Sequence, residues 1–89
     1  MWFIIDKINH MEGDVSALDD LPRKLGLRIS YYRRLKSLSQ EELAERIYWS
    51  VGYLAQLEAP SCKKVPSLIM LYKIAEKLGI TVSELLDFK

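Results

Sequence analysis

The chain has 89 residues, of which 49% are hydrophobic and 28% are charged, and it contains a single cysteine. This composition is typical of a globular protein rather than a disordered one, and the length allows one hydrophobic core but not two. The longest apolar run, residues 1–5, is too short for a signal peptide or for a membrane span of about 20 residues. We therefore expect a cytoplasmic protein, in which Cys62 alone forms neither an internal disulfide nor a thiolate metal cage.

Formal charge is distributed unevenly along the chain. Residues 1–22 hold one lysine and five acidic residues, for a net charge of −4. Residues 23–89 hold twelve Lys or Arg against seven Asp or Glu, for a net charge of +5. A basic body suits a polyanionic partner, although ordinary solvated surface charge explains the same pattern.

Residues 1–22 are predicted to form a short N-terminal arm. They begin with the β-prone apolar sequence MWFII and continue into an acidic stretch that contains Gly13. Three roles remain open: the arm docks on the body, pairs with its copy in a dimer, or stays mobile. An apolar patch of this kind usually marks an interface, so we favour docking or dimerisation.

From residue 23 onward, apolar residues recur at helical spacing and predict five helices. The first helix is expected over residues 22–37. Pro22 suits its opening turn because proline has no backbone N–H to leave unpaired. Its inward face is expected to carry Leu25, Ile29, Tyr32 and Leu35.

The second helix is predicted to begin after Ser39. The Ser39 hydroxyl can accept the backbone N–H of Glu42 while the Glu42 side chain reaches back, a capping box worth ~1 kcal/mol. Leu43, Ala44 and Ile47 then face the core.

The third helix is predicted to be short, with Ser50 as its N-cap and Glu58 near its end. Leu54 and Leu57 are spaced to face inward. Pro60 prevents further extension, so residues 59–66 are expected to form a loop.

Two more helices complete the predicted all-α domain. The fourth is capped by Ser67 and stops at Gly79, which can adopt the left-handed conformation that closes a helix. The fifth begins at Thr81, paired with Glu84 in a second capping box. The residues expected in the core from these two helices are Leu68, Leu71, Ile74, Ala75, Leu78, Leu85 and Leu86.

The sequence SQEELA at residues 39–44, followed by Ser50 and by YLAQLE at residues 53–58, resembles a known motif. It is similar to the helix-turn-helix of the phage-repressor and Cro family, also called the xenobiotic-response-element type. The similarity continues through Pro66-Ser67, Ile74-Ala75, Leu78-Gly79 and Leu85-Leu86, and so covers nearly all of residues 25–88. It implies a five-helix lambda-repressor-like DNA-binding domain over residues 23–89, in a small transcriptional regulator that acts as a repressor.

The resemblance implies that the second helix lies over the DNA backbone while the third enters the major groove. Ser39 and Gln40 would then bond a phosphate, aided by the positive end of the helix dipole. Helix capping alone is the alternative for both residues, and for Ser39 the two roles are compatible.

The third helix would present to the groove a surface that carries both polar and apolar residues. Only Gln56 on this surface can read a base with bidentate geometry, by pairing with adenine, and Val51 can touch a thymine methyl. An equally weighted alternative is that Val51, Gly52 and Ala55 are neutral surface, so that selectivity is modest or depends on DNA shape. Tyr53 either donates its hydroxyl to a phosphate or packs beside the turn. The residues assigned to this surface are Ser50, Val51, Gly52, Tyr53, Ala55 and Gln56.

Five further basic residues and one acid are also assigned roles. Arg33 and Glu58 occupy positions that form a partly buried ion pair in the family, the alternative being two unrelated surface charges. Lys63 and Lys64 lie in the loop that the family places beside the DNA backbone, although a solvated loop explains them almost as well. Arg28 and Arg34 would add long-range electrostatic attraction to DNA.

The chain departs from the family at Tyr48 and Pro60, where glycine is usual. Both changes remove a residue that easily adopts a positive φ. We therefore expect a different turn geometry, with the bulk of Tyr48 and Trp49 buried against the body.

Other classes of function are weighed against DNA binding. An enzyme is not expected, because His10 is the only imidazole and no Cys or acidic cluster has nucleophile or metal spacing. We expect no cofactor, no metal, no small-molecule substrate and no membrane partner. The main alternative is a protein-interaction module with the same fold. For a DNA-binding protein we expect a homodimer that places two third helices in successive major grooves, ~34 Å apart.

Overall fold

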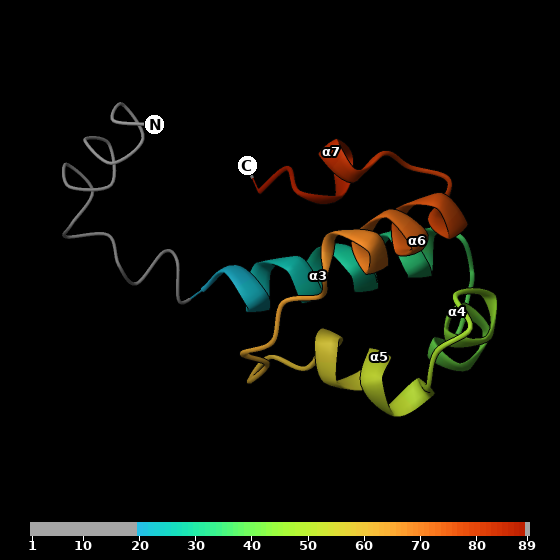
Figure 1. Cartoon of the computed structure of the whole chain (residues 1–89), viewed down its shortest axis with the longest axis horizontal. Coiled ribbons are helices and arrows are strands. Elements are labelled where there is room, and N and C mark those ends of the chain that lie inside the picture. Colours follow the sequence, from blue (N-terminus) through green and yellow to red (C-terminus); the bar gives the residue numbers. More distant parts are fainter. Residues whose placement is uncertain (1–19, 89) are drawn as a thin grey trace, which may run out of the picture.

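The computed structural model describes residues 20–88, and all the regular elements in that range are α-helices (Figure 1). The predicted all-α fold is therefore confirmed. Residues 1–19 of the predicted arm lie outside the described residues, so its docking or dimerisation role stays a prediction. In chain order the helices are α3 (Leu21–Leu35), α4 (Gln40–Arg46), α5 (Val51–Glu58), α6 (Leu68–Leu78) and α7 (Val82–Leu85).

Side-chain caps set the starts of four helices. At α4 the Ser39 hydroxyl accepts the Glu42 N–H at 3.0 Å, and the Glu42 carboxylate accepts the Ser39 N–H at 3.0 Å. The Ser50 and Ser67 hydroxyls cap α5 and α6 by accepting the backbone N–H three residues later, and the second predicted capping box is present at α7. Gly79 ends α6 with a φ of 71°, as predicted. These boundaries follow from local hydrogen bonding that the sequence encodes directly.

Helix α3 is displaced from its predicted range of residues 22–37, beginning at Leu21 and ending at Leu35. The chain leaves the helix through Ser37, whose φ of 56° lies in the left-handed region. This turn brings the Leu38 N–H to the carbonyl of Arg33 at 3.0 Å and places the Leu38 side chain in the core. A closing turn of this kind satisfies carbonyls that the last helical turn would leave unpaired.

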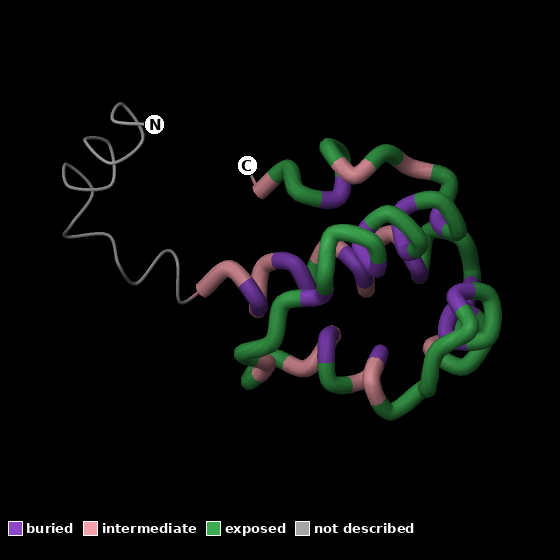
Figure 2. The backbone as a smooth tube through the Cα atoms, in the orientation of Figure 1, coloured by how far each residue is buried: buried purple, intermediate pink, exposed green. Residues whose placement is uncertain are grey.

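One hydrophobic core lies between the helices, and Figure 2 shows the buried stretches alternating with exposed ones along each of them. The buried hydrophobic residues are Leu25, Ile29, Leu38, Leu43, Ala44, Ile47, Leu54, Leu57, Met70, Leu71, Ile74, Ala75, Leu78 and Leu85.

Within the described residues, no helix is long and apolar enough to cross a bilayer.

Three leucines predicted in the core are exposed, so those assignments are wrong. Leu35 is 61% exposed, because it lies one and two turns beyond Tyr31 and Leu27 on a flank of α3 that faces away from the core. Leu68 is 72% exposed at the first position of α6, whose inward face is centred on Ile74 instead. Leu86 follows the four-residue helix α7 and is 39% exposed, since that short helix turns only Leu85 fully inward.

Helix α3 is the central element, in contact with α5, α6 and α7. At Gly26 its backbone lies so close to α5 that a Cβ would overlap the backbone carbonyl of Leu57. Only glycine lets the two backbones come this close. The position of α5 on the body therefore depends on Gly26, a role that was not predicted from the sequence.

Candidate nucleic-acid interface

Helix α5 buries one face and leaves the other open. Leu54 and Leu57 are almost completely buried against the body. In Figure 1, α5 lies along the outer edge of the molecule, and α6 and α7 lie on the other side of α3. Of the predicted groove-facing residues, Ser50, Val51, Gly52 and Gln56 are exposed, whereas Tyr53 and Ala55 are half-buried. Among residues 20–88, nothing covers the outward face of α5, which can therefore contact a partner.

A buried ion pair fixes the end of α5 to α3. The Arg33 guanidinium donates from Nε and Nη2 to the two Glu58 carboxylate oxygens, each at 2.9 Å, and from Nη1 to the Leu38 carbonyl at 2.7 Å. The two side chains are only 9% and 4% exposed. A charge-assisted, two-pronged contact of this kind restrains orientation as well as distance.

Gln40 is engaged within the protein rather than directed at solvent. Its side-chain amide donates to Glu58 Oε1 at 3.1 Å, which joins the start of α4 to the end of α5. The predicted phosphate contact from this side chain would therefore have to share the amide with Glu58. Ser39, by contrast, is exposed at the α4 N-terminus, where its hydroxyl serves the cap.

The capping box at α4 also changes the pKa of the Glu42 carboxyl group. The Glu42 carboxylate accepts the Ser39 backbone N–H, and this hydrogen bond holds the pKa of Glu42 below its ordinary value. The Ser39 side chain acts in the same direction. Hydrogen bonding to the charged form stabilises it, so Glu42 keeps its negative charge to lower pH than a free glutamate.

The turn between α4 and α5 contradicts the expectation of buried aromatic bulk. Tyr48 is 87% exposed and Trp49 is 50% exposed. Tyr48 itself adopts a φ of 57°, so the chain keeps a left-handed turn residue without glycine. The Trp49 N–H donates to the Ala44 carbonyl at 2.9 Å and stabilises this geometry. The turn is thus stabilised by a backbone hydrogen bond and does not require the Tyr48 and Trp49 side chains to be buried.

Tyr53 links this turn to the following helix. Its ring meets the Trp49 ring edge-on, with centroids 5.5 Å apart. Burial raises the pKa of the Tyr53 phenol, with a smaller contribution from Cys62, so the hydroxyl stays protonated and able to donate.

The loop after α5 brings its lysines to the exposed face of that helix. Lys63 and Lys64 are both exposed, and Lys64 Nζ donates to the Gln56 side-chain oxygen at 3.3 Å. The Lys64 backbone N–H donates to the Cys62 sulfur at 3.3 Å, which shapes the loop. The structure thus joins Lys64 to Gln56, an association that no local sequence pattern indicated.

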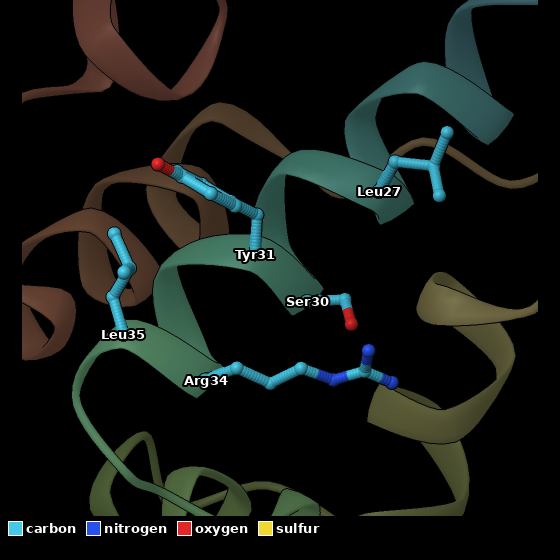
Figure 3. A pocket seen from close by; sticks show the side chains of 5 residues that line it. All are labelled: Leu27, Ser30, Tyr31, Arg34 and Leu35. Atoms are coloured by element: carbon cyan, nitrogen blue, oxygen red, sulfur yellow. The ribbon is translucent and has the colours of Figure 1, made fainter.

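The two remaining arginines differ. Arg28 is structural: its guanidinium donates to the Glu84 carbonyl at 2.6 Å and to the Tyr32 hydroxyl at 3.1 Å, tying α3 to α7. Arg34 is exposed and extends from the side of α3 shown in Figure 3. There it lines a shallow depression together with Leu27, Ser30, Tyr31 and Leu35.

The family model described as helix-turn-helix matches residues 20–85. The chain belongs to this family, in its phage-repressor and Cro type. It is 36% identical over 66 residues to the uncharacterized HTH-type transcriptional regulator y4dJ of Sinorhizobium fredii (strain NBRC 101917 / NGR234), a match that covers 74% of this chain and 83% of that protein. It is 37% identical over 65 residues to the HTH-type transcriptional regulator SinR of Bacillus subtilis (strain 168), covering 73% of this chain but 58% of SinR.

Two solved structures share the fold. The clp gene regulator ClgR from Corynebacterium glutamicum superposes with a TM-score of 0.68 at 33% identity, covering 74% of this chain and 68% of ClgR. SinR, described as the master regulator for biofilm formation and solved in complex with DNA, superposes with a TM-score of 0.66 at 36% identity, covering 71% and 98%. The predicted fold and the prediction of a helix-turn-helix transcriptional regulator are confirmed at the level of the family.

Proposed function

We propose that this protein binds double-stranded DNA in a sequence-specific manner and acts as a small transcriptional repressor. The observation that carries the proposal is the open outward face of α5, bordered by the exposed lysines of the following loop. Helix α5 would enter the major groove while α4 lies across the backbone. The similarity to SinR, whose structure was solved in complex with DNA, supports DNA binding by this fold. Such a protein would work where the genome is, in the cytoplasm.

The residues divide into those that position the protein and those that read sequence. Ser39, Lys63 and Lys64 would contact phosphates, which fix register and carry no sequence information. Gln56 would read a base, using its amide while Lys64 approaches its oxygen. Val51 would add an apolar contact to a thymine methyl.

The protein would bind as a homodimer, because one short helix contacts too few base pairs for useful selectivity. Exposed apolar side chains give a second copy somewhere to pack: the α3 stripe in Figure 3 includes Leu27 and Tyr31, and α6 exposes Leu68, Ile69 and Tyr72. Sedimentation equilibrium with and without DNA tests this, since a strict monomer at high concentration in both cases would exclude the dimer.

A binding-site selection from random duplexes, followed by titration at several salt concentrations, tests DNA binding. We expect log affinity to fall by ~0.9 for each neutralised phosphate per tenfold rise in salt. Lys63→Gln and Lys64→Gln should each weaken binding to all duplexes and reduce that slope by about 1. Lys73→Gln, on the exposed surface of α6, is the matched control and should change neither quantity.

A protein-interaction module is the second candidate, and one observation favours it. The outward face of α5 presents Val51, Gly52 and Ala55, none of which has a hydrogen-bonding side chain for a base edge. Under this alternative the selection would enrich no duplex, and binding to a protein partner would depend far less on salt. A steep salt dependence with an enriched sequence would exclude it.

A further inference from the structure

The turn that joins α4 to α5 displays two exposed aromatic side chains. Tyr48 leaves 87% of its surface exposed, and Trp49 leaves half. Isolated exposed aromatics are common, but these two are consecutive and lie directly before Ser50, the N-cap of α5. They therefore border the end of α5 that would enter the groove first.

Tyr48 is also held in a backbone conformation that costs stability. Its φ of 57° lies in the left-handed region, where a residue with a Cβ is disfavoured by ~1–2 kcal/mol and glycine is not. Burial of the side chain does not offset this cost, because the ring is almost fully exposed. The turn hydrogen bond from Trp49 stabilises the backbone, but the Tyr48 side chain itself gains no contact in the core, and a strained residue of this kind is often found where a side chain serves an external contact.

We propose that Tyr48 and Trp49 form a further contact with the DNA backbone at the edge of the groove occupied by α5. This inference rests on the DNA-binding function proposed above and adds a site to it. Both side chains combine an apolar ring with a donor at its tip, the Tyr48 hydroxyl and the Trp49 indole N–H. The rings fit the apolar faces of deoxyribose, and the donors fit phosphate oxygens.

The geometry around Trp49 supports this assignment. Its ring rests edge-on against Tyr53, in the first turn of α5, with centroids 5.5 Å apart. The Tyr53 backbone N–H in turn donates to the Ser50 hydroxyl at 3.1 Å. The Trp49 ring is thus positioned against the helix that would enter the groove, while half of its surface remains free for a partner.

Tyr48→Gly tests the proposal, because its effects on folding and on binding should have opposite signs. Glycine relieves the positive φ, so the variant should melt at the same temperature as wild type or higher. Loss of one hydrogen bond to a charged phosphate should weaken duplex binding about tenfold. Tyr48→Asn, which also tolerates this conformation, should behave alike.

The loss should be nearly equal for the selected duplex and an unrelated one, since backbone contacts carry no sequence information. Tyr48→Phe keeps the ring and removes only the donor, so most of the loss should persist. Lys73→Gln changes an exposed side chain of α6 that takes part in neither proposed contact, and it should leave duplex affinity unchanged. These measurements use the full chain and fluorescence anisotropy of labelled duplexes.

The outcomes separate this contact from DNA binding itself. Wild-type protein that binds no duplex at any salt concentration would overturn the proposed function and the contact with it. Wild-type binding with unchanged affinity in Tyr48→Gly and Tyr48→Asn would overturn only the contact. Marked destabilisation by both variants would assign Tyr48 a folding role and would also overturn it. Wild-type affinity in Tyr48→Phe would overturn the phosphate hydrogen bond.

Discussion

Arg33 on α3 and Glu58 at the end of α5 form a two-pronged ion pair with both N–O distances at 2.9 Å. Both side chains are nine-tenths buried or more, so water has little access to either charge. Gln40 at the start of α4 donates to the same carboxylate. Three helices of the candidate interface therefore meet at one buried acid, and the orientation of α5 depends on it.

Removal of one member of this pair should be costly. Glu58→Gln leaves the Arg33 charge buried without a countercharge, and we expect the free energy of unfolding to fall by ~3 kcal/mol. Arg33→Met should cost a similar amount, and the double variant should cost less than the sum of the two. Arg23→Ala, which breaks the exposed pair with Asp20, is the control and should cost less than ~1 kcal/mol. Urea denaturation measures all four; a Glu58→Gln loss no larger than the control would contradict a buried pair.

The close approach of α3 and α5 predicts opposite effects at two glycines. Gly26→Ala places a Cβ against the Leu57 carbonyl, and the resulting overpacking should lower the free energy of unfolding by ~2 kcal/mol or more. Gly52→Ala is the matched control, since a Cβ there meets no atom within 4 Å. Because alanine favours a helix over glycine, Gly52→Ala should raise stability by up to ~1 kcal/mol. Equal effects at the two positions in thermal melts would show that α3 and α5 are not packed this closely.

The capping box at α4 predicts a contribution to acid sensitivity. The pKa of Glu42 is lowered in the folded state by the Ser39 hydrogen bonds, so its contribution to stability is fully present above the unfolded value of ~4.3. That contribution is lost as pH falls through the lower, folded pKa. Glu42→Gln retains an acceptor for the cap but does not titrate, so its stability should fall less steeply than that of wild type below pH ~4.

Unfolding monitored by circular dichroism at pH 7 and at lower pH measures this difference. Glu41→Gln, in the same turn but outside the capping box, is the charge-matched control. Parallel curves for Glu42→Gln and wild type across the acid range would contradict the assignment.

The parts of the fold that depend on local chemistry were predictable from the sequence. Ser39, Ser50 and Ser67 each accept a backbone N–H three residues later, so the helix starts followed from residue type and spacing. The inward faces were less certain. Leu35 and Leu68 lie on helices with apolar residues on more than one side, and periodicity alone does not decide which stripe meets a neighbour.

Contacts between distant parts of the chain were not predictable from local pattern. Arg28 bonds the carbonyl of Glu84, 56 residues away, although its charge alone indicated a role in attracting DNA. The Gln40 contact with Glu58 was likewise absent from the prediction. Tyr48 was misjudged for another reason: the turn keeps its left-handed residue because backbone hydrogen bonds stabilise it even without glycine.

Base reading by α5 gives a prediction that separates specificity from general affinity. Among the outward residues, Gln56 alone has a side chain capable of bidentate pairing, and its oxygen already meets Lys64 at 3.3 Å. Gln56→Ala should weaken binding to the selected duplex by ~1–3 kcal/mol and should leave an unrelated duplex nearly unaffected. Lys64→Gln should instead weaken binding to both duplexes by a similar factor, because it would remove the proposed phosphate contact. If Gln56→Ala lowered both affinities equally, Gln56 would serve to position Lys64, and α5 would recognise DNA by shape rather than by base contacts.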